Sequence, residues 1–359
     1  MKRTIVLMGP QHPALPEPLV LDLVLQDERV IDAIPCIGYV HRGLEAMVER
    51  VEFTEFGTVA ERICGICSFM HGMGYAMAVE DLMKVEIPER ARALRLVWAE
   101  LSRIHSHLLW LGLAADAFGF ENLFMHCWRI REEILDIFER TTGGRVIFSV
   151  NRIGGVKRDI SDDTLAGIVL KLGEVQETFV GAARVFAQDP SIKHRLCGLG
   201  VLSREDAVAV DAVGPMARAS GVPADVRATG ALYQGLEVDL VVEEEGDCMA
   251  RCLVRVREIP RSIELIRRIV ARMPRGSHPV NVPVKGMPNG ETFVRLEQPR
   301  GEVVYYLKAN GTRLLERFRA RTPTFANVPA MIKLVKGCEL ADVPSIILTI
   351  DPCISCTER

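Results

Sequence analysis

The sequence predicts an α+β fold that is predominantly α, with a core of long helices and small β-sheets near the N-terminus and in the C-terminal third. Apolar residues recur at helical spacing through the long stretch 87–116. Residues 19–35 instead alternate around the polar segment QDER, which is typical of a β-hairpin. In 281–320 the turn signals MPNG and ANGT flank ETFVRLEQPRGEVVYYLKAN, which indicates strands.

The helical part begins near residue 40 and occupies most of the chain. The segment 68–83 carries Met and Ala at helical spacing, and Pro88 is well placed in a first helical turn. The apolar stripe of 87–116 consists of Leu94, Val97, Leu101, Ile104, Leu108 and Leu111. Further helices are predicted at 121–141, 161–187, 203–213 and 261–272, and the apolar run PSIILTI predicts a buried strand.

The chain is expected to form a single interleaved domain. It shows no internal repeat, low-complexity segment or clean linker, and its 359 residues can bury a substantial core. We divide it into an N-terminal β region (1–40), a mainly helical core (41–280), and a β region with a C-terminal segment (281–359).

The composition is that of an ordinary globular protein, with 48% apolar and 25% charged residues. A net charge of −3 gives no sign of nucleic-acid binding. The apolar run before Gly9 is too short for a signal peptide, and no stretch reaches the roughly 18 apolar residues that cross a bilayer. We therefore expect a cytoplasmic protein with reduced cysteines, and the mean hydropathy of +0.16 favours contacts with partner subunits.

Two Cys-x-x-Cys pairs lie almost a whole chain apart. Cys64 and Cys67 occur in RICGICSFMHG, and Cys353 and Cys356 occur in DPCISCTER. Two such turns facing each other make a four-sulfur cage, and thiolates suit zinc, copper(I), nickel or iron–sulfur chemistry. The alternative is a zinc ion with a purely structural role. A structural zinc ion usually stabilises a small module, and a domain this large has less need of one. A metal centre that takes part in a reaction is therefore favoured.

The two cysteine motifs resemble the signatures of the nickel–iron hydrogenase large subunit. GPQHPALPEP, YVHRGLE, ELSRIHSHLLWLG, GPMARASGVPADVR and EQPRG also resemble that family, so the resemblance covers nearly the entire chain. GPQHP and HRGLE are similar to the energy-converting, membrane-associated hydrogenases and to the 49 kDa quinone-site subunit of complex I. Complex I subunits lack the four cysteines, which favours the hydrogenase. The expected fold is then that of the hydrogenase large subunit.

The resemblance implies a nickel–iron centre whose iron carries CO and CN ligands. Cys64 and Cys353 would bind nickel terminally, and Cys67 and Cys356 would bridge nickel and iron, which makes 281–359 the segment that completes the metal site. The implied reaction is reversible hydrogen formation, 2 H⁺ + 2 e⁻ = H₂. A helix starting just after Cys67 would favour negative sulfur at its N-terminus.

Two carboxylates are candidates around this centre. Glu17 matches the part of the family's N-terminal signature that holds the proton-relay glutamate, with a solvated loop carboxylate as its alternative. Glu45 resembles the carboxylate that holds an outer magnesium ion in many relatives. Those relatives often add a C-terminal histidine, where this sequence has Arg359. An Arg359–Glu45 salt bridge is therefore the alternative to magnesium.

Other side chains are expected to order the centre. Arg300 resembles the arginine that donates to a cyanide, since a guanidinium has donors and does not titrate. Asp351 would orient Arg300 or simply form an Asp-Pro turn, and Arg62 would play a similar ordering role. His71 would donate to a bridging sulfur.

His105 and His107 are expected to be structural or to face a partner, and the remaining cysteines are expected to be structural. His105 and His107 fall on different faces of a helix, so they do not form one site. Six cysteines have no ligand spacing and are expected to be free and buried: Cys36, Cys127, Cys197, Cys248, Cys252 and Cys338.

The chain has no ferredoxin-type cysteine run, so electrons would need a partner. The resemblance implies an iron–sulfur small subunit, a ferredoxin-like subunit, ferredoxin as electron donor or acceptor, and integral membrane subunits that translocate ions. The chain would then lie peripherally on the cytoplasmic face of the membrane. The alternatives are a quinone-site scaffold related to complex I and a zinc-stapled structural subunit.

Overall fold

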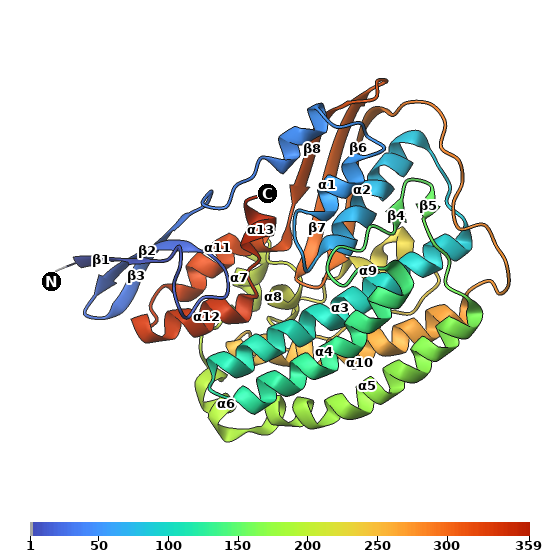
Figure 1. Cartoon of the computed structure of the whole chain (residues 1–359). Coiled ribbons are helices and arrows are strands. Elements are labelled where there is room, and N and C mark those ends of the chain that lie inside the picture. Colours follow the sequence, from blue (N-terminus) through green and yellow to red (C-terminus); the bar gives the residue numbers. More distant parts are fainter. Residues whose placement is uncertain (1–2) are drawn as a thin grey trace.

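The computed structural model describes residues 3–359 and confirms the predicted fold class. Long helices fill one side of the molecule, one small antiparallel sheet projects at the N-terminus, and another closes the opposite side (Figure 1). No helix within 3–359 is both long and apolar enough to cross a membrane.

The helical core is built around α3 (Glu89–Ala117), which is buried over most of its length. It packs against α4 (Glu121–Thr142), against α10 (Cys248–Arg272) and, less extensively, against α2 (Ser68–Met83). Helix α5 (Asp162–Gln188) covers α10 and α4 from outside. Pro88 stands directly before α3, as its fixed backbone angle favours.

The predicted helix at 261–272 is only the second half of α10. The helix starts much earlier because the Asp247 side chain accepts a hydrogen bond from Ala250 N and caps it. Pro260 lies inside the helix, where a sequence pattern would normally predict a break. Burial on both sides of Pro260 stabilises the continuous helix against this cost.

Each of the two larger sheets has three antiparallel strands. The first has the order β1 (Arg3–Met8), β2 (Val20–Gln26) and β3 (Arg29–Cys36), so the hairpin predicted at 19–35 is present. The second has the order β6 (Asn289–Gln298), β7 (Gly301–Asn310) and β8 (Leu315–Arg321). Helix α2 packs on β6 and β7, which places the first cysteine motif beside this second sheet.

Short elements connect these parts. They are η1 (Leu44–Glu49), α1 (Phe56–Glu61), β4 (Asn151–Arg152), β5 (Gly155–Val156), α6 (Pro190–Leu196), α7 (Arg204–Ala209), α8 (Pro215–Arg218), α9 (Val226–Thr229), η2 (Ala231–Tyr233), α11 (Pro323–Val335), η3 (Leu340–Asp342), α12 (Val343–Ile350) and α13 (Ile354–Thr357).

The strand predicted for PSIILTI is wrong, because the segment forms the helix α12. Pro344 lies in its first turn, a position that suits proline in a helix. The run is short and mostly apolar, so its periodicity does not separate strand from helix. Asp351 ends the helix in a left-handed conformation (φ 60°), and this turns the chain into the second cysteine motif.

Candidate metal centre

The fold brings the two cysteine pairs together in its interior. Cys64 and Cys67 lie in the turn between α1 and α2, while Cys353 and Cys356 lie at the start of α13. The sulfur atoms of Cys64 and Cys353 are 3.3 Å apart, and those of Cys64, Cys67 and Cys356 all lie within 4.8 Å of one another. All four side chains are buried.

Hydrogen bonds from other residues of the chain hold the two cysteine motifs together. The Arg42 guanidinium donates to Ile63 O at 2.8 Å and to Ser355 O at 3.0 Å, so one side chain joins both turns. Cys353 N donates to the Thr324 hydroxyl at 2.9 Å. Neither Arg42 nor Thr324 was predicted to have a role, although Arg42 lies in YVHRGLE, one of the motifs that carried the resemblance.

The four thiols share protons among themselves. Hydrogen bonds from Cys353, and then from Cys356 and Cys67, hold the pKa of Cys64 well below its ordinary value. The pKa of Cys356 is raised because its own hydrogen bond to Cys353 favours the protonated form. Four buried sulfurs that already favour one thiolate form a donor set suited to a soft or borderline cation, which would replace the shared protons. The residues present therefore fit a thiolate-bound metal.

Arg300 and Asp351 form a buried pair against this cage. The guanidinium contacts the Asp351 carboxylate at 2.8 Å and donates to its main-chain oxygen at 2.9 Å. Another nitrogen of Arg300 lies 3.5 Å from the Cys67 sulfur. Burial alone would lower the pKa of Arg300, but Asp351 and the cysteines raise it above its ordinary value. The pair thus places a fixed positive charge beside the sulfurs.

His71 belongs to the first turn of α2 and contacts the second cysteine motif. Its Nε2 is 3.3 Å from the Cys356 sulfur. Burial lowers the pKa of His71 to about 4, so the ring is neutral at physiological pH.

Glu17 reaches the cage from the loop between β1 and β2. Its carboxylate accepts a hydrogen bond from Ile354 N, directly after Cys353. Burial raises the pKa of Glu17 to about 7, and Arg300 opposes this shift. A carboxyl with this pKa can both hold and release a proton near neutral pH.

The contacts of Glu45 favour the ion pair that was expected as an alternative to magnesium. Its Oε1 accepts from Arg359 Nε at 2.7 Å and from Ala320 N at 2.9 Å, while Arg319 binds Oε2. Burial alone would raise the pKa of Glu45, but these donors lower it. Both oxygens are engaged by the chain itself.

The Arg62 side chain points away from the cage, while of the two helix histidines His105 reaches the first cysteine turn and His107 contacts α10. The Arg62 side chain is exposed and donates to Thr58 O at 2.6 Å, so it does not order Arg300. Its position at the end of α1 turns it outward, whereas Arg42 takes the ordering contacts. His105 contacts Ile66 O at 3.1 Å and His107 contacts Glu258 at 2.8 Å, on different sides of α3.

Three of the six other cysteines are not buried as predicted. Cys36 ends strand β3 at the surface, and Cys197 follows the exposed last turn of α6, so both are exposed. Cys338 is partly exposed, and Cys127, Cys248 and Cys252 are buried.

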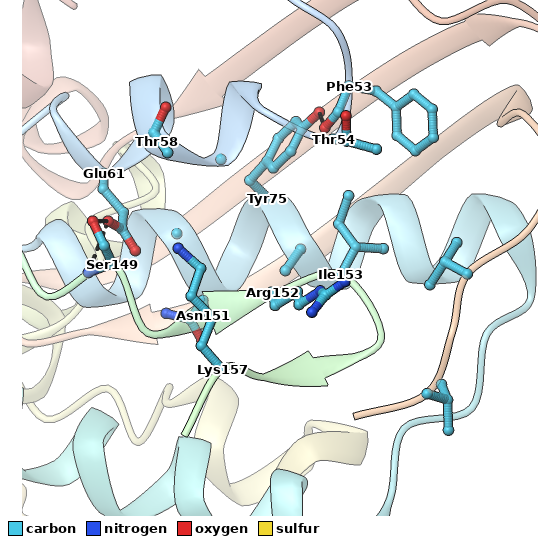
Figure 2. Close-up of a pocket in the computed structure, with 15 residues that line it drawn as sticks. Phe53, Thr54, Thr58, Glu61, Tyr75, Ser149, Asn151, Arg152, Ile153 and Lys157 are labelled. Carbon is cyan, nitrogen blue, oxygen red and sulfur yellow. Dashed lines mark hydrogen bonds between the residues drawn. The ribbon is translucent and has the colours of Figure 1, made fainter. Parts of the chain in front are cut away.

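A separate pocket of about 340 Å³ lies between α1, α2 and the β4–β5 hairpin (Figure 2). None of the four cysteines lines it. The Glu61 carboxylate stands at one end and accepts hydrogen bonds from Ser149 N at 3.0 Å and Ser149 Oγ at 2.9 Å. Burial raises the pKa of Glu61.

Family models match most of the chain. The model for the respiratory-chain NADH dehydrogenase 49 Kd subunit matches residues 117–286 and 282–359, and the model for nickel-dependent hydrogenases matches residues 42–114. A carbon monoxide-induced hydrogenase from Rhodospirillum rubrum is 38% identical over 98% of both chains. The chain belongs to the family of energy-converting hydrogenase large subunits and complex I 49 kDa subunits.

Other members of this family show its breadth. A membrane-bound hydrogenase subunit alpha from Pyrococcus furiosus is 36% identical over 98% of this chain and 86% of the relative. One subunit of an NADH-quinone oxidoreductase from Chloroherpeton thalassium is 33% identical over 98% of this chain and 87% of the relative. A chain in the structure of the membrane-bound sulfane sulfur reductase, an archaeal respiratory membrane complex, superposes with a TM-score of 0.93 at 29% identity, over 99% of this chain and 98% of that chain.

Proposed function

We propose that this chain is the catalytic large subunit of an energy-converting nickel–iron hydrogenase. It catalyses 2 H⁺ + 2 e⁻ = H₂ in either direction and exchanges the electrons with ferredoxin through an iron–sulfur small subunit. The observation that carries this proposal is the buried cage of four cysteines, in a family that includes hydrogenases.

The cage supplies the ligands of the metal centre. Cys64 and Cys353 would hold nickel as terminal ligands, and Cys67 and Cys356 would be the ligands shared with an iron that would carry CO and CN. When bound, the centre supplies the chemistry that makes or splits the hydrogen–hydrogen bond. Thiolates suit it because they are soft, strongly donating ligands.

The surrounding side chains transfer protons and provide positive charge. Glu17 takes and returns protons beside Cys353, since its pKa of about 7 suits both directions. Arg300, held by Asp351, provides donors and positive charge for an anionic ligand. In this proposal Glu45 anchors Arg359, and magnesium is the alternative occupant of that position.

The partners follow from the need to move electrons and ions. An iron–sulfur small subunit accepts electrons near the cage, a ferredoxin-like subunit passes them on, and integral membrane subunits translocate ions. The chain then lies peripherally on the cytoplasmic face of the membrane. The names of relatives that belong to membrane-bound complexes support this arrangement.

A quinone-site scaffold is the second candidate, because the 49 Kd subunit model matches more of the chain than the hydrogenase model does. The third candidate is a structural subunit in which the same four sulfurs hold a zinc ion.

Metal content separates these candidates. The complex is purified anaerobically from its own host and analysed by elemental mass spectrometry. Roughly one nickel on this subunit, with iron beyond what the clusters need, is expected. Zinc alone would overturn the proposal in favour of a staple, and a chain without transition metal would favour the quinone-site scaffold.

A further inference from the structure

Tyr305 is a buried phenol that contacts the histidine behind the cysteine cage. Its hydroxyl lies 2.9 Å from His71 Nδ1, and both side chains are fully buried. The two rings meet nearly at right angles, at 88°. Tyr305 was not singled out from the sequence, where it reads only as an inward-facing residue of a strand.

Helix α2 leaves room for this ring. A Cβ atom at Gly74 would lie 2.1 Å from Cε2 of Tyr305, so any larger residue would displace the phenol. Glycine inside a helix costs roughly 0.5–1 kcal/mol relative to alanine. The close approach of the Tyr305 ring to α2 therefore explains why position 74 is glycine despite this cost.

The hydrogen-bond partners of Tyr305 indicate which acceptor receives its phenol proton. Gln298 Nε2 donates to the phenol oxygen at 3.3 Å, so the phenol proton points to another acceptor. His71 Nδ1 at 2.9 Å is closer than Met70 O at 3.4 Å. An imidazole that accepts at Nδ1 carries its own proton on Nε2. That nitrogen is the one 3.3 Å from the Cys356 sulfur.

We propose that Tyr305 is a positioning residue that fixes His71 as the Nε2–H tautomer, so that the ring donates its N–H to the Cys356 sulfur. A donor on a ligand atom tunes the metal that the ligand holds. This effect on a metal rests on the proposed function, whereas the tautomer depends only on this chain.

Two neighbouring tyrosines give a matched pair of variants. Tyr305→Phe keeps the ring against Gly74 and removes only the hydroxyl. Tyr306→Phe is the control, because Tyr306 faces the other side of β7 and its hydroxyl donates to Glu291 at 2.7 Å.

The first measurement is the ¹⁵N spectrum of the histidine rings in the histidine-labelled complex, by solid-state NMR, with His71 identified by its absence in His71→Gln. The wild-type complex and Tyr306→Phe should carry the proton on Nε2 alone, and Tyr305→Phe should show both tautomers. A proton on Nδ1 in the wild type, or the same spectrum in Tyr305→Phe, would overturn the proposal.

The second measurement is nickel release to a chelator. Loss of such an outer hydrogen bond typically weakens metal binding by roughly 10–100-fold, so Tyr305→Phe should release nickel at least about 10 times faster than Tyr306→Phe. In a His71→Gln background, where an amide donor has no tautomer to fix, Tyr305→Phe should add nothing. An equal added loss in both backgrounds would show that Tyr305 acts only through packing.

The two proposals fail in different ways. A wild-type complex without nickel would refute the hydrogenase assignment, and the ring spectrum would still decide the tautomer. A nickel-loaded complex with the proton on Nδ1 would refute the role of Tyr305 and leave the hydrogenase assignment standing.

Discussion

Glu17 is partly buried and accepts a hydrogen bond from the backbone N–H of Ile354, beside Cys353. We predict that Glu17→Gln slows hydrogen–deuterium exchange catalysed by the complex by roughly 100-fold or more, the usual weight of a general acid or base. Nickel and iron content should not change, because a relay group and no ligand is removed. The control is Glu86→Gln, at an exposed carboxylate between α2 and α3. Unchanged exchange in Glu17→Gln would rule out the relay role.

Cys64 differs from Glu17 because it is assigned as a ligand. Its lowered pKa makes it the sulfur that most readily carries charge in the cage. We predict that Cys64→Ser loses nearly all nickel, since a hydroxyl is a much poorer ligand for nickel than a thiolate. Cys197→Ser, at an exposed cysteine, should retain it. Full nickel content in Cys64→Ser, measured by elemental mass spectrometry, would overturn the ligand assignment.

Single residues differ in how well the sequence predicts their place. Cys64 and Cys353 could be paired because their motifs are distinctive. Arg62 stands inside the same motif, yet its side chain points outward at the end of α1. Arg42, some twenty residues earlier, instead makes the contacts that join the two cysteine turns. Such contacts depend on how separate turns meet, which local spacing does not encode.

At the scale of elements, the sequence of α2 is tightly constrained by its neighbours. Gly74→Ala would place a methyl group into the Tyr305 ring. We predict a loss of about 1–3 kcal/mol in the free energy of unfolding, as is usual for overpacking, despite the better helix propensity of alanine. Chemical denaturation measures it.

Gly167→Ala is the control for that substitution. Gly167 lies inside α5, and no atom stands within 4 Å of a Cβ built there. Alanine should therefore stabilise the chain by roughly 0.4–1 kcal/mol at this position. If both variants were stabilised, the tight packing of Tyr305 on α2 would be refuted.

Elements with strong periodicity could be predicted from sequence, and the exceptions have physical causes. Helix α3 is long enough for its apolar stripe to be unmistakable, and the hairpin of β2 and β3 alternates cleanly. Helix α12 is short and mostly apolar, so period alone could not separate helix from strand. Helix α10 continues through Pro260, because burial on both sides outweighs a local preference.

At the scale of the whole molecule, a buried network of charges on the short helices α8 and α9 joins α3, α10 and the second sheet. Arg218 contacts Glu258 at 2.8 Å and Glu297 at 2.8 Å, and Arg227 contacts Asp225 at 2.7 Å. All of these side chains are buried. Breaking one member would leave an uncompensated charge inside the protein, which is strongly destabilising. The network therefore ties the helical core to the β6–β8 sheet.

His107 makes this network sensitive to acid. Burial lowers its pKa to about 4, below the 6.5 of an unfolded histidine, although Glu258 opposes the shift. The unfolded state therefore binds more protons below pH 6.5, so stability is complete above that pH and is lost as the pH falls toward 4. We predict that His107 alone accounts for about 2 kcal/mol of lost unfolding free energy between pH 7 and pH 5.

The measurement is chemical denaturation at both pH values, in wild type and in His107→Gln. The glutamine keeps a donor for Glu258 and does not titrate, so the variant should lose less stability on acidification. His194→Gln, at an exposed histidine in the last turn of α6, is the control and should behave like wild type. An unchanged pH dependence in His107→Gln would contradict the assignment.

The separation of the cysteine pairs also sets an order of events during biosynthesis. Cys64 and Cys67 are made early, yet Cys353 lies 289 residues beyond Cys64 along the chain. The four-sulfur cage cannot exist until residue 356 has been synthesised and has folded back onto α2. Until then the first pair consists of two unpartnered thiols that can bind metals or oxidise in the wrong context. A metal held by all four sulfurs, as proposed above, would therefore enter the site only after the whole chain has been made.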